Sequence, residues 1–248
     1  MIELYFDYKF KVCLLFYVTC SMLHDMRYNA RQLRELKEST VQSEVSKIKR
    51  RPLYFILENI YDTYNVGGLF RLADALAVER MYLCGQTEIP PNAKIKKASI
   101  GTYKVVPWIY KTTVVEAIED LKSKVKSQKS KVPEKEIKPI ILKEGKRERL
   151  SLEIQLESKQ ETYSNIKSTR SSTILIIAVE QDKRSIDYRK ADYILPLALV
   201  FGNETFGVLP ETLDAVDKIV EIPMWGVNKS LNVIVSAAIV SYQALARS

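Results

Sequence analysis

The sequence is poor in the residues that build metal and disulfide sites. It has one histidine, His24, and three cysteines without CxxC spacing, so it offers neither a disulfide framework nor a plausible zinc site. A GxxxxGK(S/T) phosphate loop and GxGxxG spacing are absent as well, which argues against a nucleotide hydrolase and a dinucleotide-binding domain. We therefore expect no metal, and a reducing cytoplasm fits the cysteine content best.

Long hydrophobic runs are also missing. The apolar run at residues 12–18 is too short for a bilayer, which needs about 20 residues. Acidic residues precede this run and no small-x-small cleavage site follows it, so it makes a poor signal peptide. We expect residues 1–25 to be an extension outside the fold, and a start codon assigned upstream of Met22 or Met26 would account for it.

Positive charge is concentrated in one part of the chain. The formal net charge is +8, which favours a polyanionic partner and leaves RNA, DNA and an anionic membrane open. Residues 121–170 hold 14 Lys and Arg against 7 Asp and Glu, whereas the rest holds 24 against 23. A local basic segment is more often a solvated insertion than a docking arm. Net charge therefore says little about the function.

The hydrophobic pattern predicts an exposed helical segment at residues 26–51, then one domain over residues 52–248. Short apolar runs rich in β-branched and aromatic residues alternate with stretches of helical periodicity. We expect strands at 53–57, 81–84, 105–106, 174–179, 197–201 and 218–222, and helices at 66–76, within 88–104, at 114–125, from Pro210 and at 231–246. This indicates an α/β fold with a parallel sheet covered by helices on both faces.

One stretch breaks this alternation. Residues 123–172 accumulate Lys, Glu, Ser and Gln, and we interpret them as a basic, partly disordered insertion that interrupts the domain. In parallel sheets, ligands bind at the carboxyl ends of the strands. Three unusual motifs fall at such ends.

The first motif is NIYDTYNVGGLFRLA, between a strand and a helix. Asn65 can cap the helix, while Gly67 and Gly68 would let a phosphate or ribose approach its positive end. Arg71 could hold an RNA phosphate through two hydrogen bonds. From spacing alone, however, a capped helix whose Arg71 pairs with Asp74 on the surface is the favoured interpretation.

The second motif is LVFGNETFGVL, at the end of a buried strand. Gly202 and Gly207 permit tight or left-handed turns. Glu204 lies between them, as a carboxylate that could orient a cation or a hydroxyl group. An ordinary strand-to-helix turn explains the pattern equally well.

The third motif is IPMWGVNKSLNVIVSAAI. Ser230 would begin an apolar helix as its N-cap. Backbone donors there, with Met224 and Leu231 as apolar walls, would suit an adenosine-like ligand better than a triphosphate. The helix is apolar on nearly every face, so it is either deeply buried or shared with another subunit, and burial within one chain is the simpler expectation.

Together, the order and spacing of these motifs resemble the SpoU (TrmH-like) family of RNA methyltransferases, within the SPOUT superfamily. The resemblance lies in NxGxxxR (Asn65, Gly67, Arg71), GNExxG (Gly202, Asn203, Glu204, Gly207), IPM (222–224) and SLNV (230–233), and it covers about residues 52–122 and 173–246, including KASIGTYKVVPW. Two departures are Ala77 where the family commonly has glycine, and the insertion.

The resemblance implies a fold and a cofactor. The fold would be SPOUT-type, with a deep C-terminal trefoil knot that forms a pocket for S-adenosyl-L-methionine. Gly202, Ile222 and Leu231 would contact this cofactor, with Met224 beside them. The family usually forms homodimers through knot elements, which would explain the apolar final helix.

The implied reaction is methyl transfer to a ribose 2′-hydroxyl of tRNA or rRNA, without a metal. Arg71 would position the hydroxyl and an RNA phosphate, because a guanidinium stays protonated at physiological pH. Glu204 and Asn65 would organise the catalytic pocket, and Ser230 with Asn232 would shape the knot loop. Target selection would fall to the N-terminal helices and the insertion.

Other functions compete with this interpretation. A noncatalytic RNA-binding protein that keeps the knotted fold is the main alternative, and the presence of Arg71, Glu204 and Asn232 argues against it. A methyltransferase acting on a base or a protein is a second, disfavoured because NxGxxxR matches the ribose-directed branch. The sequence does not separate tRNA from rRNA.

Overall fold

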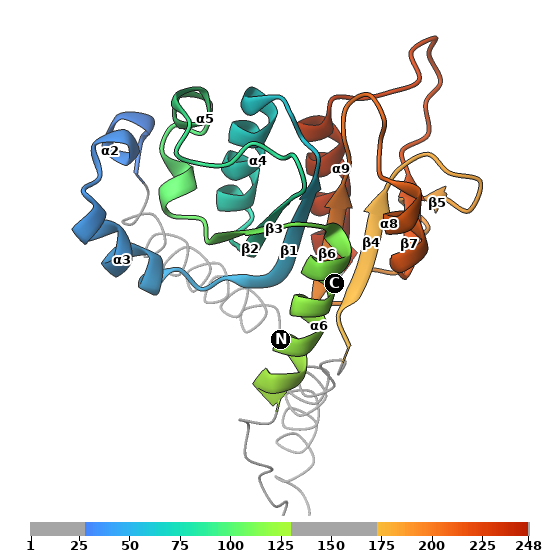
Figure 1. Cartoon of the computed structure of the whole chain (residues 1–248), viewed down its shortest axis with the longest axis horizontal. Helices are drawn as coiled ribbons and strands as arrows, with labels where there is room; N and C mark the ends of the chain where they lie inside the picture. Colours follow the sequence, from blue (N-terminus) through green and yellow to red (C-terminus); the bar gives the residue numbers. More distant parts are fainter. Residues whose placement is uncertain (1–27, 130–172, 248) are drawn as a thin grey trace, which may run out of the picture.

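A computed structural model describes residues 28–129 and 173–247, and they form one parallel sheet packed between two layers of helices (Figure 1). The sheet has the strand order β3-β2-β1-β6-β4-β7-β5, and every pairing is parallel. Its strands are β1 (Arg51–Glu58), β2 (Val78–Cys84), β3 (Trp108–Lys111), β4 (Leu175–Val179), β5 (Ile186–Asp187), β6 (Leu197–Phe201) and β7 (Lys218–Glu221). The predicted α/β fold with a parallel sheet is confirmed.

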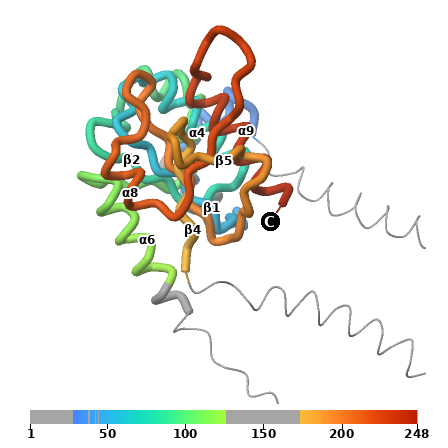
Figure 2. Tube along the Cα trace, turned by 90° about the vertical axis from the view of Figure 1, so that its right-hand side faces the viewer, coloured from blue at the N-terminus to red at the C-terminus, as the bar shows by residue number. Residues whose placement is uncertain are grey.

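The helices lie on both faces of the sheet. They are α2 (Ala30–Glu35), α3 (Glu38–Lys47), α4 (Thr63–Ala75), α5 (Ala93–Ala98), α6 (Val114–Lys129), α8 (Pro210–Ala215) and α9 (Val233–Arg247), with a 3₁₀ turn η2 (Thr102–Lys104). Figure 2 shows α6 and α8 on one side of the strands and α9 on the other. Both faces are covered, as predicted.

The two faces have separate cores because side chains alternate along each strand. On β1, Leu53, Phe55 and Leu57 pack with α4 and α9, and the residues between them, Tyr54 and Ile56, pack with α6 and α8. All residues of β6 are buried. Buried apolar area on both faces therefore fixes the central strands β1 and β6 side by side, which brings the motifs that follow them together.

Helix α2 and the residue that follows it contact this domain at Gly101 and Lys104. Leu33 of α2 is buried, and its carbonyl oxygen lies where a Cβ atom on Gly101 would come within 2.7 Å. Lys104 donates hydrogen bonds to the carbonyl oxygens of Arg34 (3.3 Å) and Leu36 (3.1 Å). The expected exposed helices are therefore present, and α2 is anchored by a buried leucine.

One predicted strand lies elsewhere, and one predicted helix extends further than expected. The strand expected at Val105 and Val106 lies at Trp108–Lys111, because those valines form a buried turn after η2 and the carbonyl oxygen of Val105 accepts a hydrogen bond from Arg50. Helix α6 continues to Lys129, so the first residues of the expected insertion are helical. The expected extension at 1–25 and the insertion beyond residue 129 lie outside the described residues.

Candidate active site

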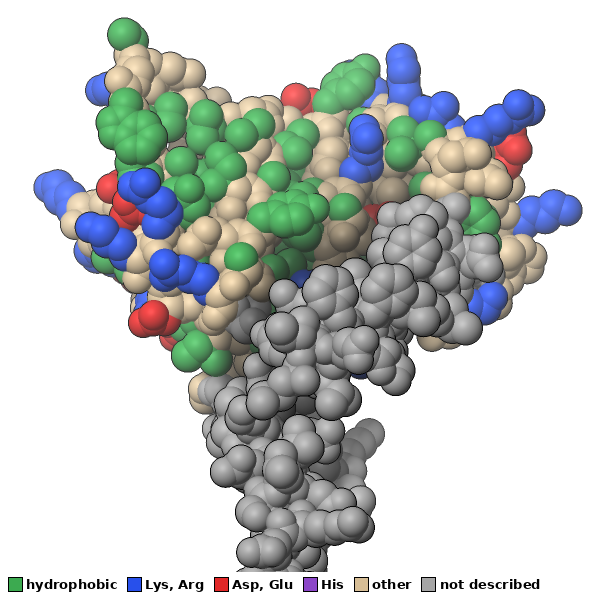
Figure 3. All heavy atoms as spheres, turned by 180° about the vertical axis from the view of Figure 1, so that it is seen from behind, with side chains coloured by type: hydrophobic (Ala, Val, Ile, Leu, Met, Phe, Trp, Pro, Cys, Tyr) green, Lys and Arg blue, Asp and Glu red, His purple; other side chains and the backbone are tan. Residues whose placement is uncertain are grey.

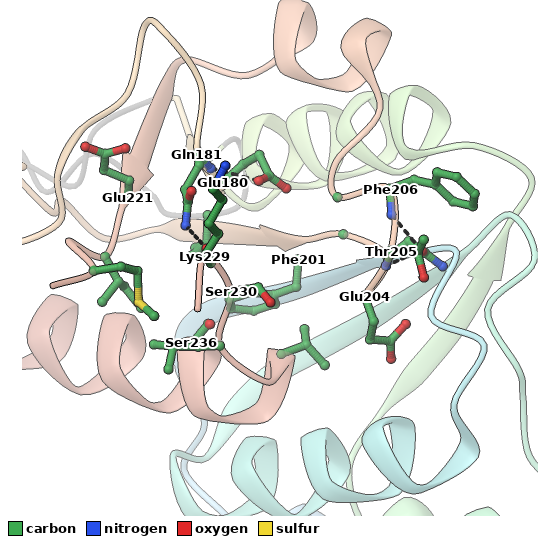
Figure 4. A pocket seen from close by; sticks show the side chains of 18 residues that line it. Glu180, Gln181, Phe201, Glu204, Thr205, Phe206, Glu221, Lys229, Ser230 and Ser236 are labelled. Carbon is green, nitrogen blue, oxygen red and sulfur yellow. Dashed lines mark hydrogen bonds between the residues drawn. The ribbon is translucent and has the colours of Figure 1, made fainter. Parts of the chain in front are cut away.

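A cavity of about 270 Å³ lies at the carboxyl ends of β4, β6 and β7 (Figure 4). Three segments far apart in the sequence line it: the end of β4, the loop between β6 and α8, and the loop between β7 and α9. Its volume is just below the ~300–1,000 Å³ range of small-molecule sites. The cavity is where a parallel sheet is expected to bind a ligand.

The structure brings most of the sequence-predicted site residues to this cavity. The predicted cofactor residues Gly202, Ile222, Met224 and Leu231 all line it. Of the predicted catalytic residues, Glu204 and Ser230 line it too. The turns after β6 and β7 therefore converge on one cavity, and the contacts of these residues with a ligand stay a prediction.

A chain of hydrogen bonds connects three predicted catalytic residues at the cavity. The Asn65 side-chain amide donates to Oε1 of Glu204 at 2.6 Å, and Nδ2 of Asn232 donates to Oδ1 of Asn65 at 3.0 Å. Only 6% of Asn65 is exposed. Because a buried amide is costly to leave unpaired, these bonds fix the Glu204 carboxylate relative to α4 and α9.

The predicted cap of α4 was wrong. Asp62, not Asn65, is the N-cap residue, and its carboxylate accepts from the backbone N–H of Tyr64 at 2.8 Å. Asn65 lies in the first turn of the helix instead. Its side chain is thereby free to join Glu204 and Asn232.

The predicted role of Gly67 and Gly68 was also wrong. A Cβ atom on Gly67 would lie 2.5 Å from Cβ of Ala98, and one on Gly68 would lie 2.3 Å from Cδ1 of Ile234. The two glycines therefore admit α5 and α9 of the protein, not a phosphate or ribose. This close packing holds α4 against both helices.

Arg71 is exposed on α4 and is not among the residues that line the cavity. Among the described residues, no ion pair joins Arg71 to Asp74. The cation acting on Asp74 is Arg50: burial raises the pKa of Asp74, and the positive charge of Arg50 partly opposes this. The surface pairing that spacing favoured is therefore absent, and the guanidinium of Arg71 is accessible to a ligand outside the cavity.

The predicted N-cap of α9 was wrong by two residues. Asn232 directly precedes this helix, and its side chain accepts from the backbone N–H of Ile234 at 2.9 Å. The backbone N–H of Ser230 instead donates to the side chain of Asn228 at 3.2 Å. Asn232 thus has two roles, because its oxygen caps α9 while its NH₂ group donates to Asn65.

The GNETFG turn is closely packed and held by hydrogen bonds. Asn203 Oδ1 accepts from the backbone N–H groups of Thr205 (2.7 Å) and Phe206 (3.0 Å), and its NH₂ group donates to the Asn59 carbonyl at 2.7 Å. Gly207 has φ +70°, a left-handed conformation that favours glycine. A Cβ atom on Gly202 would lie 2.3 Å from the backbone of Gly207, so both glycines are required by the turn itself.

Sequence reasoning missed two cavity residues that follow β4. The Glu180 carboxylate accepts from the backbone N–H of Val208 at 2.9 Å, and Gln181 donates to the Lys229 carbonyl at 2.5 Å. Their signal was available, because both directly follow a predicted buried strand, at the edge where parallel sheets bind ligands. Together they tie the end of β4 to the other two loops.

Two structural absences hold for the described ranges 28–129 and 173–247. No group of three or more His, Cys, Asp or Glu side chains there could hold a metal ion. Within the same ranges, no helix has the length and apolarity that crossing a membrane requires.

The chain belongs to the SpoU rRNA Methylase family, whose model matches residues 52–145 and 141–242. The two matched ranges contain the three motifs and all the residues that line the cavity.

Two curated relatives are named as tRNA 2′-O-methyltransferases. Over 69 residues, 28% of this chain and 33% of the relative, the chain is 45% identical to a tRNA (guanosine(18)-2′-O)-methyltransferase of Aquifex aeolicus. Over 201 residues, it is 26% identical to the enzyme of the same name from Thermus thermophilus, and this match covers 81% of the chain and 78% of the relative. The chain thus aligns with a third of the first relative's length and most of the second.

Solved structures share the fold at low identity. A TrmH/SpoU tRNA modifying enzyme of A. aeolicus superposes with a TM-score of 0.54 at 23% identity, covering 88% of this chain and 81% of that one. The SpoU methyltransferase AviRb from Streptomyces viridochromogenes, in complex with the cofactor AdoMet, gives 0.52 at 20% identity, over 81% of this chain and 62% of that one.

Proposed function

We propose that the chain transfers a methyl group from S-adenosyl-L-methionine to a ribose 2′-hydroxyl of tRNA or rRNA. One observation carries this proposal: the Glu204–Asn65–Asn232 hydrogen-bond chain fixes Glu204, which lines the cavity together with residues of the two loops that bear family motifs. The names of the Aquifex and Thermus relatives support a ribose hydroxyl as the acceptor.

The cavity fits the proposed cofactor in chemistry. Ile222, Met224 and Leu231 provide apolar walls, while Glu180 and Glu221 bring carboxylates that could face a cation or ribose hydroxyls. S-adenosylmethionine supplies an electrophilic methyl group on a positively charged sulfur when bound. Gly202, Ile222, Met224 and Leu231 would hold it, as the sequence predicts.

The remaining predicted residues would act on the RNA. Glu204 is fixed by Asn65 at the cavity rim, so its carboxylate can orient the ribose hydroxyl by hydrogen bonding. Arg71 is exposed and lies outside the cavity lining, where it would bind the phosphate beside the target ribose with two hydrogen bonds. Ser230 and Asn232 would shape the loop that closes the site before α9.

We infer that the loops around the cavity belong to a deep trefoil knot. The convergence of the β6–α8 and β7–α9 loops supports this topology, since knot elements would form the cofactor pocket. Limited proteolysis of the protein, with and without S-adenosylmethionine, checks whether the 222–232 loop belongs to the cofactor pocket. We expect cofactor to protect the 222–232 loop.

We also infer a homodimer that covers α9. Deep burial of this helix within one chain was the simpler expectation, and it is wrong for part of its surface: Val235 is 45% exposed and Tyr242 is 58% exposed. Figure 3, which views the molecule from the side of α9, shows hydrophobic side chains gathered on that face. Light scattering of the wild type should give twice the monomer mass, and Tyr242→Asp should reduce it; a monomeric wild type would end this proposal.

Labelled methyl transfer tests the function. The protein is incubated with labelled S-adenosylmethionine and either total tRNA or rRNA, and nucleosides are analysed for ribose methylation. We expect a 2′-O-methylated nucleoside from the wild type, a loss of at least about tenfold with Arg71→Lys, and more with Arg71→Ala, because lysine lacks the two-pronged geometry. Binding of RNA without transfer would support the noncatalytic alternative instead.

The remaining questions are which segments select the RNA and in which compartment the protein acts. We assign RNA selection to the helices α2 and α3 and to the basic insertion, and the cysteine content favours the cytoplasm. Deleting residues 130–172 should weaken RNA binding and flatten its salt dependence if the basic side chains neutralise phosphates. Unchanged binding would make the insertion passive.

A further inference from the structure

An aromatic ring lies exposed beside the cavity. Phe206, in the GNETFG turn, is 76% exposed and is also one of the residues at the cavity boundary. Figure 4 shows its ring directed away from the cavity interior and from Glu204. Burying a phenyl ring is worth about 2–3 kcal/mol, so a ligand that covers this ring would gain binding free energy.

The backbone that carries this ring is rigidly held. Asn203 accepts a hydrogen bond from the N–H of Phe206, and the backbones of Asn203 and Gly207 pair with each other in both directions, at 3.0 and 2.9 Å. The Glu180 side chain packs against Gly207, and its carboxylate accepts a hydrogen bond from the backbone N–H of Val208. The backbone from which the ring projects is thus held in the same turn as Glu204, which lies two residues earlier.

We propose that Phe206 is a stacking platform for a nucleobase of the RNA substrate. This inference rests on the proposed function and names how the same site holds its RNA. Aromatic rings at such surfaces stack on bases that are unpaired or flipped out, and the phenyl face accepts any base. Because the ring points outward, a base could stack on it while the cavity holds the cofactor.

The neighbourhood favours a nucleic acid over another occupant. Glu204, fixed by Asn65, can orient the ribose, and Arg71 offers an exposed guanidinium for phosphate. A base stacked on Phe206 would therefore belong to the strand whose ribose Glu204 is proposed to orient, because both residues lie in the same turn at the cavity. A second copy of the chain is the competing occupant, and the test separates the two.

Three variants test the platform: Phe206→Ala, Phe206→Leu and Phe206→Tyr. For each we would measure the Kd for RNA at fixed salt, the Kd for S-adenosylmethionine, kcat, KM for RNA, and the mass in solution. We expect RNA binding about 5- to 150-fold weaker for Phe206→Ala, the effect of removing one stacked base. Phe206→Leu should resemble it, since leucine is apolar but not planar, and Phe206→Tyr should resemble the wild type.

Other readouts distinguish stacking from a structural role. KM for RNA should rise, while the Kd for S-adenosylmethionine, the salt slope of RNA binding and the mass stay unchanged, because no phosphate contact is lost. RNA binding equal to wild type in Phe206→Ala, or a fall in mass in that variant, would overturn the proposal. Methyl transfer by the wild type is measured separately. If the wild type transfers no methyl group but its RNA binding still depends on Phe206, the proposed function is refuted and the stacking role of Phe206 is not.

Discussion

The side-chain amide of Asn65 donates a 2.6 Å hydrogen bond to the carboxylate of Glu204, joining two residues that are 139 positions apart. This contact links the first turn of α4 to the loop after β6. Since Asn232 donates to the other end of the same amide, one buried asparagine sets the relative position of three segments. The orientation of Glu204 therefore depends on the identity of residue 65.

Asn65→Asp tests this dependence. Two carboxylates at hydrogen-bond distance cannot both ionise, so the pKa of one is raised in the folded state. Because the carboxyl pKa is raised in the folded protein, the free energy of unfolding is unaffected by ionisation at low pH. It falls as the pH rises through the raised pKa. We expect urea unfolding to report a loss of about 1–3 kcal/mol at pH 8 relative to wild type and a smaller loss at pH 5.

The double variant Asn65→Asp with Glu204→Gln is the matched control. A glutamine amide can donate to the new carboxylate, so most of the stability at pH 8 should return. If the single variant is as stable at pH 8 as at pH 5, the Asn65–Glu204 contact does not exist as described.

Asn232 is expected to show two separable effects. Asn232→Ala removes the cap of α9 and should cost about 0.5–2 kcal/mol of stability. Asn232→Asp keeps an oxygen for the N–H of Ile234 but loses the NH₂ group that donates to Asn65. We therefore expect Asn232→Asp to stay within about 1 kcal/mol of wild type in unfolding while methyl transfer falls tenfold or more. Equal activity would show that the hydrogen bond to Asn65 is not needed.

The sequence predicted the central strands of the sheet well because these strands are buried on both faces. Runs such as Leu53–Leu57 and Leu197–Phe201 are continuously apolar, which is typical of a short strand covered on both sides. The loops at Gly202 and Ile222 converge because both leave the carboxyl ends of parallel strands, which lie at one edge of the sheet.

Helix caps could not be predicted because the deciding partners are distant in sequence. Asp62 and Asn65 are both good capping residues, and local sequence does not choose between them. Glu204 and Asn232 decide the choice, because they give the buried Asn65 side chain a hydrogen-bond partner at each end. Likewise, Gly67 and Gly68 looked like a ligand site, and only the positions of α5 and α9 reveal them as packing positions.

Gly67 and Gly68 should respond differently to alanine. At Gly67 the new Cβ would lie 2.5 Å from Cβ of Ala98 and 2.9 Å from the backbone N of Ser99, so α4 and α5 must separate. At Gly68 the obstacle is the end of the Ile234 side chain, which can change rotamer. We expect thermal unfolding to show Gly67→Ala destabilised by about 1–3 kcal/mol.

Gly68→Ala should cost less than Gly67→Ala, because alanine gains about 1 kcal/mol of helix propensity and Ile234 can yield. The loss of methyl transfer in the two variants should follow their loss of stability, because neither glycine is among the residues that line the cavity. An equal loss of stability in Gly67→Ala and Gly68→Ala would mean that the Ile234 side chain yields no more easily than the backbone of α5.

Cys84 should be unreactive in the folded protein. It is 1% exposed at the end of β2, and burial, followed by the negative charges of Glu58 and Glu116, raises the pKa of its thiol to about 12. The thiolate is the reactive form. In a Cys13→Ser, Cys20→Ser background at pH 8, we expect iodoacetamide to modify Cys84 at least about 100-fold more slowly in the native protein than in urea, measured by mass spectrometry.

The sign of the pH effect follows from the same pKa. An acid whose pKa is raised on folding stabilises the native state below its ordinary value, near 8.5 for a thiol, and this contribution is lost as pH rises toward 12. Cys84→Ala should therefore lose less stability between pH 8 and pH 10 than the parent background does. Rapid native-state alkylation at pH 8 would contradict this prediction and would show that the end of β2 opens to solvent in the folded protein.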